Sequence, residues 1–167
     1  MRKTAAPPKR SAGIILYRRS ASAIEVLLIH PGGPLWKNKD EGAWSIPKGL
    51  YEPGEVALTA AKREFKEETG SVPDGAFVSL GEFKLPSGKR LAVWAVEGDL
   101  DLATFRSETF RMEWPPRSGR FADFPEADRA AWFPPGDAMR KITKGQRSIL
   151  EALFTTLRYA RNYKGHG

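Results

Sequence analysis

The sequence contains no cysteine, which excludes disulfide bonds, thiolate zinc sites and cysteine nucleophiles. Its only two histidines, His30 and His166, argue against a histidine-rich metal site and against a Ser-His-Asp triad. The lack of cysteine is compatible with a reducing cytosol. Together these absences exclude thiol chemistry and most forms of imidazole chemistry.

Long apolar runs are missing as well. The basic segment 1–10 contains Pro7 and Pro8, and the next apolar run is only Ile14–Tyr17. A signal peptide needs an apolar core of roughly 7–15 residues, and a membrane-spanning helix needs about 20. We therefore expect a cytoplasmic protein that makes no contact with a membrane.

The composition is that of an ordinary globular chain. It has 167 residues, of which 41% are hydrophobic and 28% charged, which excludes a wholly disordered protein. The length suits one domain, so we expect a flexible basic segment at 1–10, a single domain at 11–163 and a tail at 164–167. The sequence predicts no oligomeric state.

The net charge of +7 suggests nucleic-acid binding, but the basic residues gather at the two ends. Residues 1–10 hold four basic and no acidic residues, and residues 139–167 hold seven basic residues and one acidic residue. The remainder, 11–138, holds 16 basic and 19 acidic residues. The basic ends are either solvated surface or a means of attracting anions, and the body is mildly acidic.

Hydrophobic periodicity predicts strands and helices in alternation. A helix begins near Glu55, places Leu58, Ala61 and Phe65 on one face, and ends at Gly70. The segment 99–128 is expected to be irregular. Strands are expected at Ser11–Arg19, Ile24–His30, Ala43–Pro47, Phe77–Leu85, Lys89–Glu97 and Arg129–Phe133, and further helices at Gly136–Ile142 and Gln146–Tyr163. This order predicts a mixed α/β domain with helices packed against a sheet.

Three acidic residues stand out on the helix that follows Glu55. Glu64, Glu67 and Glu68 have i, i+3 and i+4 spacing, so a helix places their carboxylates on one side of one turn. Such carboxylates are often only a solvated face. Here the preceding Pro47-Lys48-Gly49 turn adds a backbone carbonyl and a cation. Hard divalent cations such as Mg²⁺ prefer oxygen ligands and often bind substrate phosphates, so this region is suited to metal-bound polyphosphate.

At this point the sequence resembles the Nudix family. The family signature matches at Gly49, Glu55, Arg63, Glu64, Phe65, Glu67, Glu68 and Gly70, and it departs only at Ser71, where the family has an apolar residue. Val72 is able to supply the missing packing. The flanking strands and the final helix also fit, over roughly residues 11–160. The resemblance implies a Nudix-type α/β/α sandwich, in which a mixed β-sheet lies between helices.

The resemblance also implies an activity and roles for individual residues. It implies a pyrophosphohydrolase that uses Mg²⁺ or Mn²⁺ to act on a nucleoside diphosphate linked to another group. Position by position, it assigns metal binding to Gly49, through its carbonyl, and to Glu64, Glu67 and Glu68. It makes Arg63 and Glu55 a structural pair, and Gly70 the end of the helix.

The base that takes the proton of the attacking water varies within the family. Glu64 and Glu67 are candidates, and so is a glutamate from a later loop. Among the later residues we expect Glu113, with Glu108 and Glu126 as alternatives. The ordinary alternative for Glu113 is a surface acid.

The substrate is suggested by two regions outside the signature. WSIPKG at Trp44–Gly49 looks like the branch that hydrolyses diadenosine polyphosphates, with Lys48 placed to meet a phosphate. The second region, Phe110–Phe133, interleaves arginines with aromatic residues. Guanidinium groups bind phosphates and rings stack on bases, so Arg117 and Trp114 are candidate contacts. Trp36 is a weaker candidate, as are Lys37 and Lys39 near it. Alternatively, the aromatics only attach a long loop to the core.

Other substrates remain alternatives. Pro86 lies near the position of a proline in the ADP-ribose hydrolases of the family, although its place in a Pro-Ser-Gly turn explains it equally well. Oxidised nucleoside triphosphates and RNA 5′ ends are also open, as is a non-catalytic nucleotide- or RNA-binding Nudix domain. The complete set of Glu64, Glu67 and Glu68 favours an enzyme, because a binding module does not need all three.

Overall fold

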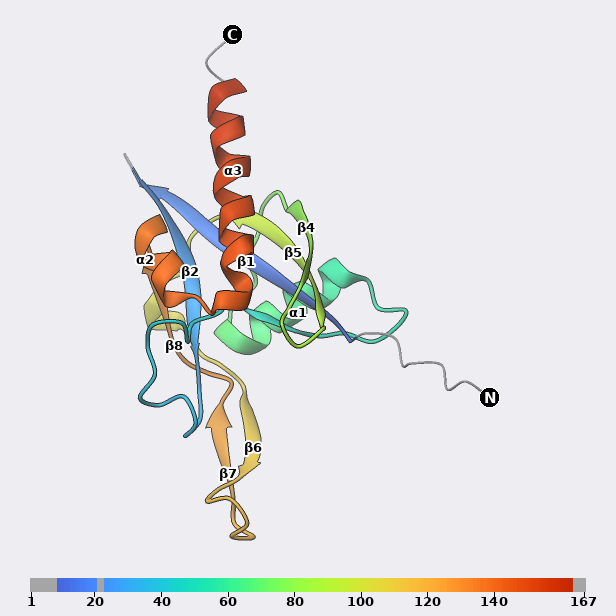
Figure 1. Cartoon of the computed structure of the whole chain (residues 1–167), viewed down its shortest axis with the longest axis vertical. Helices are drawn as coiled ribbons and strands as arrows, with labels where there is room; N and C mark the ends of the chain where they lie inside the picture. The colour runs from blue at the N-terminus through green and yellow to red at the C-terminus, as the bar shows by residue number, and fades with distance from the viewer. Residues whose placement is uncertain (1–8, 21–22, 164–167) are drawn as a thin grey trace.

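The computed structural model describes residues 9–20 and 23–163, with side chains up to residue 158 (Figure 1). Most of the expected segment 1–10 and all of the expected tail 164–167 therefore lie outside the described residues. The strands are β1 (Arg10–Ser20), β2 (Ala23–Pro31), β3 (Lys48–Leu50), β4 (Val78–Lys84), β5 (Arg90–Glu97), β6 (Thr109–Glu113), β7 (Phe121–Pro125) and β8 (Ala127–Phe133). The α-helices are α1 (Ala57–Thr69), α2 (Pro135–Lys141) and α3 (Arg147–Tyr163), and 3-10 turns lie at η1 (Leu102–Thr104) and η2 (Lys144–Gln146).

The central sheet has six strands. Its order is β4-β5-β1-β2-β8, and the short β3 pairs with the beginning of β1. Strand β1 runs parallel to β5 but antiparallel to β2 and β3. The outer strands β4 and β8 pair antiparallel with β5 and β2. The mixed sheet expected from the sequence is thus confirmed.

Alternating side chains along β1 explain how both faces of the sheet are covered. Successive residues of a strand point to opposite faces. Ile14 and Leu16 belong to the buried cluster that includes Phe65 of α1, whereas Ile15 belongs to the cluster that includes Leu150 and other residues of α3. Helix α2 joins α3 on that second face. The α/β/α sandwich is therefore confirmed, and α1 lies on the face opposite α2 and α3 (Figure 1).

Two expectations about local structure are wrong. Ala43–Pro47 is not a strand: Trp44 and Ser45 form only isolated bridges, and the strand is the following Lys48–Leu50. The segment 99–128 is not irregular, because β6 and β7 form a two-stranded antiparallel ribbon within it. The ribbon projects from the body of the molecule in Figure 1, so its residues lack the burial that produces clear alternation in the sequence.

The other expected elements are present with small shifts of their ends. Strands β4 and β5 form the predicted hairpin, in which the Gly88 N–H donates to the Leu85 carbonyl at 2.9 Å. Helix α1 buries Ala61 and Phe65 as expected, whereas Leu58 is only partly buried. No helix among the described residues is long and apolar enough to cross a membrane.

Candidate active site

Helix α1 carries the three glutamates of interest and is fixed at both its core face and its end. Phe65 is fully buried against the sheet, which sets the rotation of the helix about its axis. Gly70 ends the helix with φ +83°, and its N–H donates to the Lys66 carbonyl at 2.8 Å. Glycine adopts this left-handed conformation without strain, as expected for a residue that ends a helix. The glutamates therefore have little freedom at the level of the backbone.

Strand β3 brings the backbone of Lys48 and Gly49 directly against α1. The Lys48 N–H donates to Glu68 Oε2 at 3.0 Å. The Glu64 carboxylate packs on Gly49 so closely that a Cβ atom at residue 49 would overlap it. In turn, β3 is held by pairing with β1, where Gly49 lies opposite Ala12. The structure thus brings together Lys48, Gly49, Glu64 and Glu68.

Arg63 connects the other acidic side chains of the signature. Its Nε and Nη2 donate to the Glu55 carboxylate at 3.2 and 3.3 Å, which is the pairing that the resemblance implies. Its Nη1 donates to Glu64 at 2.9 Å and to Glu67 at 3.4 Å. These hydrogen bonds, above all those to Glu55, raise the pKa of the Arg63 guanidinium. Arg63 therefore stays charged and holds Glu64 and Glu67 on the same side of the helix.

Burial and repulsion by neighbouring carboxylates disfavour the charged forms of Glu64 and Glu68. Burial raises the pKa of Glu68 to about 8, although its hydrogen bond from the Lys48 N–H acts in the opposite direction. Burial also raises the pKa of Glu64, and the neighbouring Glu67 adds to that shift. Clustered carboxylates of this kind are typical of functional sites, because a bound cation relieves both penalties.

A second pair of glutamates approaches α1 from the segments next to the ribbon. The Glu108 N–H donates to the Glu67 carbonyl at 2.7 Å, and the Glu126 N–H donates to the Glu108 carbonyl at 2.8 Å. Partial burial raises the pKa of Glu126, and the charges of Glu67 and Glu108 raise it further. Glu67 and Glu108 therefore lie close enough to Glu126 to raise its pKa.

Glu113, the base expected from the sequence, lies elsewhere. It is the last residue of β6 and pairs with Phe121 at the outer part of the ribbon. A strand rises about 3.3 Å per residue, so five residues separate it from Glu108 by roughly 17 Å. The structure brings Glu126 and Glu108, and not Glu113, to α1. The signal in the sequence was weak, because a segment expected to be irregular gave no reason to prefer one glutamate over another.

The donor set suits a hard divalent cation. It consists of carboxylate oxygens with the nearby Gly49 carbonyl, and oxygen ligands of this kind bind Mg²⁺ and Mn²⁺. Within residues 9–20 and 23–158, no three acidic or histidine side chains already stand in a metal-holding arrangement. The hydrogen bonds of Arg63 to Glu64 and Glu67 account for the present direction of those two side chains. The chemistry of the donors thus fits the metal that the resemblance implies.

The substrate contacts expected from the sequence lie in two places. Trp36 is 38% exposed on the loop between β2 and β3, with Lys39 Nζ 4.9 Å from its ring centroid. Trp114 and Arg117 lie in the turn between β6 and β7, where Arg117 is exposed and has φ +58°. The structure does not bring this turn to α1. It does bring the base of the ribbon to the loop, because a Cβ at Gly33 would lie 3.2 Å from the Phe110 ring.

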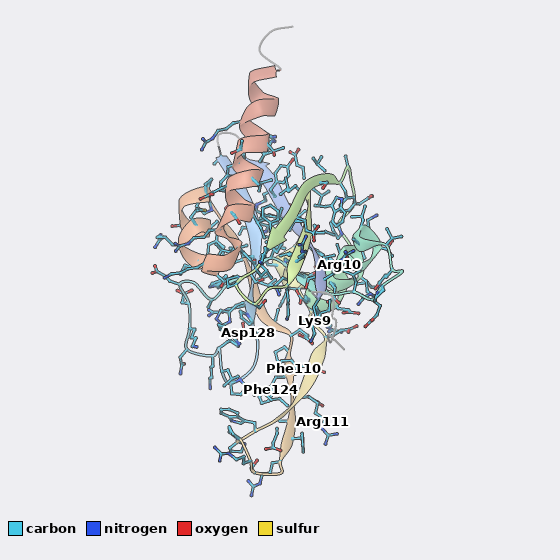
Figure 2. All side chains as sticks on the ribbon, turned by 45° about the vertical axis from the view of Figure 1, so that its right-hand side comes forward. Lys9, Arg10, Phe110, Arg111, Phe124 and Asp128 are labelled. Atoms are coloured by element: carbon cyan, nitrogen blue, oxygen red, sulfur yellow. The ribbon has the colours of Figure 1, made fainter. Side chains whose placement is uncertain are left out.

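The aromatic residues of the ribbon lie in two places, at its inner end and further out. Phe110 and Phe124 face each other with their centroids 6.1 Å apart and lie at the end of the ribbon nearest the body (Figure 2). They match the alternative interpretation, in which aromatics attach the segment to the core. Further out, Arg111 lies 4.9 Å from the Phe121 ring centroid, and Phe121 is exposed.

The comparison with protein families agrees with the geometry around α1. A family model described as the NUDIX domain matches residues 7–153. The chain belongs to the Nudix family. This confirms the resemblance carried by residues 49–70 and extends it over most of the chain.

Three relatives show how varied the named activities of similar Nudix proteins are. The chain is 28% identical over 144 residues to an 8-oxo-(d)GTP phosphatase of Mycolicibacterium smegmatis, covering 80% of this chain and 37% of that protein. It is 41% identical over 59 residues to the asymmetrical bis(5′-nucleosyl)-tetraphosphatase of Caenorhabditis elegans, covering 35% and 38%. It is 27% identical over 157 residues to an RNA pyrophosphohydrolase of Erythrobacter litoralis, covering 90% of each. The chain thus spans less than two-fifths of the length of the first two relatives.

Proposed function

We propose that this Nudix protein hydrolyses a pyrophosphate bond in a nucleoside diphosphate linked to another group, with a dinucleoside polyphosphate as its substrate. The observation that carries the proposal is the contact of Glu64 and Glu68 with the β3 backbone at Lys48 and Gly49. Arg63 holds Glu67 on the same side of the helix as Glu64. Proteins bind nucleotide polyphosphates together with divalent cations. This site offers oxygen ligands for a cation, and beside them a lysine for a phosphate.

We assign the metal ligands to Glu64, Glu67, Glu68 and the Gly49 carbonyl, with Mg²⁺ as the metal and Mn²⁺ as a substitute. A bound cation supplies neutralisation of phosphate charge and acidification of a water molecule. The Glu55–Arg63 pair keeps α1 and the preceding turn in register.

Hydrolysis itself needs few protein groups. Water attacks one phosphorus atom, the bond from that phosphorus to the bridging oxygen breaks, and the bridging oxygen leaves with the second phosphate. Glu126 accepts the proton of the attacking water, because its carboxylate lies close enough to Glu67 and Glu68 to interact with their charges. Lys48 meets a phosphate oxygen, and positioning with charge stabilisation provides most of the acceleration.

Two observations support a dinucleoside polyphosphate. The WSIPKG segment looks like the diadenosine polyphosphate branch, and its Lys48 lies beside Glu68. The exposed ring of Trp36 and the outer ribbon residues Trp114 and Arg117 offer separate surfaces for a base and a phosphate. A substrate with two nucleosides is able to use both.

The 5′ end of RNA is the second candidate. It is favoured by the relative from Erythrobacter litoralis, which aligns over 90% of both chains. In that case the exposed arginines of the ribbon would contact the nucleotides that follow the reacting phosphates.

A substrate panel tests the proposal. The purified protein is incubated with Mg²⁺, and separately with Mn²⁺, in the presence of diadenosine polyphosphates, ADP-ribose, nucleoside triphosphates or 5′-triphosphorylated RNA, and the products are resolved. The proposal predicts the highest kcat/KM for a diadenosine polyphosphate. Faster turnover of RNA would select the second candidate, and no turnover of any substrate would overturn the assignment as an enzyme.

A further inference from the structure

His30 is a buried titratable residue that the proposed reaction does not use. It lies near the end of β2 and has no exposed surface. Both ring nitrogens are engaged: Nδ1 is 2.8 Å from Asp128 Oδ1, and Nε2 is 2.6 Å from the Lys39 carbonyl oxygen. A carbonyl only accepts hydrogen bonds, so Nε2 must carry a hydrogen. A buried polar side chain satisfied at both ends fixes the groups that it joins.

The two partners of His30 belong to different parts of the site. Lys39 lies on the loop between β2 and β3, and its ammonium stands over the Trp36 ring. Asp128 lies at the start of β8, two residues after Glu126, and Figure 2 shows it beside the inner end of the ribbon. Trp44 packs edge-on to the His30 ring at a centroid distance of 5.2 Å and prevents it from turning. His30 therefore links the loop that presents Trp36 to the segment that carries Glu126.

The backbone next to His30 holds the same segment from a second direction. The Gly32 N–H donates to the Glu126 carbonyl at 3.1 Å. Gly32 packs so tightly on the Pro125 carbonyl that no Cβ would fit there. Residues 30–32 thus contact Pro125, Glu126 and Asp128. The end of β2 therefore fixes the position of the Glu126 backbone.

We propose that His30 is a positioning residue for hydrolysis: by joining Asp128 to the Lys39 carbonyl, it fixes the backbone from which Glu126 reaches the reacting water. This inference rests on the proposed function and adds to it a residue outside the Nudix signature. It predicts that the effect of His30 on turnover passes through Glu126.

A double-mutant cycle tests this coupling. Asp128→Asn keeps the size of the side chain but replaces the carboxylate that faces Nδ1, and His30→Gln keeps a donor for the Lys39 carbonyl but loses Asp128. Each variant is measured in the wild-type and in the Glu126→Gln background, with a diadenosine polyphosphate and Mg²⁺. Asp99→Asn is the matched control, because it removes the exposed carboxylate that pairs with Arg18 at 3.1 Å, far from this network in sequence.

The expected result is non-additive. In the wild-type background, Asp128→Asn and His30→Gln lower kcat by ~10-fold with a smaller change in KM, since small displacements of a catalytic group are costly. In the Glu126→Gln background each changes kcat by less than about twofold, because residues that act as a unit are not additive. Asp99→Asn leaves kcat unchanged in both backgrounds.

The failure of this inference is distinguishable from the failure of the proposed function. An equal loss of kcat in both backgrounds, or no loss in either, would overturn the positioning role while leaving the hydrolase intact. Thermal unfolding of each variant is measured together with the kinetics. If His30→Gln does not fold, Asp128→Asn decides the outcome, because the Asp128 side chain is partly exposed. No turnover by the wild-type protein would overturn the proposed function itself.

Discussion

The contact between Gly49 and Glu64 gives the sharpest test of the site, because it depends on the absence of one methyl group. In the structure, a Cβ atom at residue 49 would occupy the space of the Glu64 carboxylate. Gly49→Ala leaves every other chemical group in place. The backbone of residue 49 cannot move away easily, since it pairs with Ala12 of β1. The Glu64 carboxylate must therefore move.

The size of the effect follows from ordinary contact distances. Non-bonded carbon atoms settle about 3.5–4.0 Å apart, so the carboxylate must shift by ~1 Å or more. Misplacement of a reacting or metal-binding group by about 1 Å can lower activity by ~10²-fold, which corresponds to about 2.7 kcal/mol of transition-state stabilisation. The side chain that moves is the flexible end of a glutamate, so its strain is only about 0.5–1.5 kcal/mol. Replacing glycine lowers the entropy of the unfolded chain and offsets about 0.4–1 kcal/mol of that cost.

We therefore expect Gly49→Ala to lose activity without losing stability. The variant should show kcat/KM reduced ~10²-fold with Mg²⁺, and a thermal midpoint within about 4 °C of the wild type. Gly136→Ala is the control, because a Cβ there meets no atom within 4 Å and kcat/KM should not change. Adding Glu64→Gln to Gly49→Ala should cause little further loss. Wild-type kcat/KM in Gly49→Ala would refute the role of this contact, and full additivity with Glu64→Gln would show that it acts through another residue.

Three further predictions concern the carboxylates. Glu67→Gln should lower kcat by at least ~10²-fold in the same assay, and an unchanged kcat would remove Glu67 from the site. Glu126→Gln should lower kcat by ~10² or more, whereas Glu113→Gln should change it less than about twofold; the reverse order would restore the base expected from the sequence. Because the pKa of Glu68 is about 8 in the folded protein against an ordinary 4.5, the folded state binds the additional proton. The free energy of unfolding in chelator should therefore fall as pH rises from about 4.5 to 8, a slope that thermal melts should detect and that Glu68→Gln should reduce.

The layers of the fold were predictable because their signals are local. The alternation along β1 and the apolar spacing of Phe65 on α1 follow directly from burial on one face of each element. The ribbon of β6 and β7 lacks this signal, and the sequence therefore did not predict it. It projects from the body, as Figure 1 shows, and few of its residues are buried, so packing imposes no regular pattern on its sequence.

The residues of the site that are close in sequence were predictable, whereas the distant ones were not. Lys48, Gly49, Glu64 and Glu68 all lie within residues 48–68, and their spacing predicted a shared location that the structure contains. The choice among Glu108, Glu113 and Glu126 depended on where a distant segment returns to α1. Spacing carries no information on that point, because backbone hydrogen bonds between segments far apart in sequence decide it.

The segment that contains Glu108 returns to α1 because it satisfies backbone carbonyl groups at the end of this helix. The last carbonyls of an α-helix have no partner within the helix and must be satisfied by other groups. In α1 the Glu67 carbonyl accepts from the Glu108 N–H and the Thr69 carbonyl accepts from the Arg106 N–H. The Glu108 carbonyl then accepts from the Glu126 N–H, so the backbone of the proposed base is two hydrogen bonds away from that of a proposed metal ligand. Because backbone groups make these bonds, substituting the side chain of Glu67 or Glu126 leaves the frame intact. Loss of activity in Glu67→Gln or Glu126→Gln therefore reports on chemistry rather than on folding.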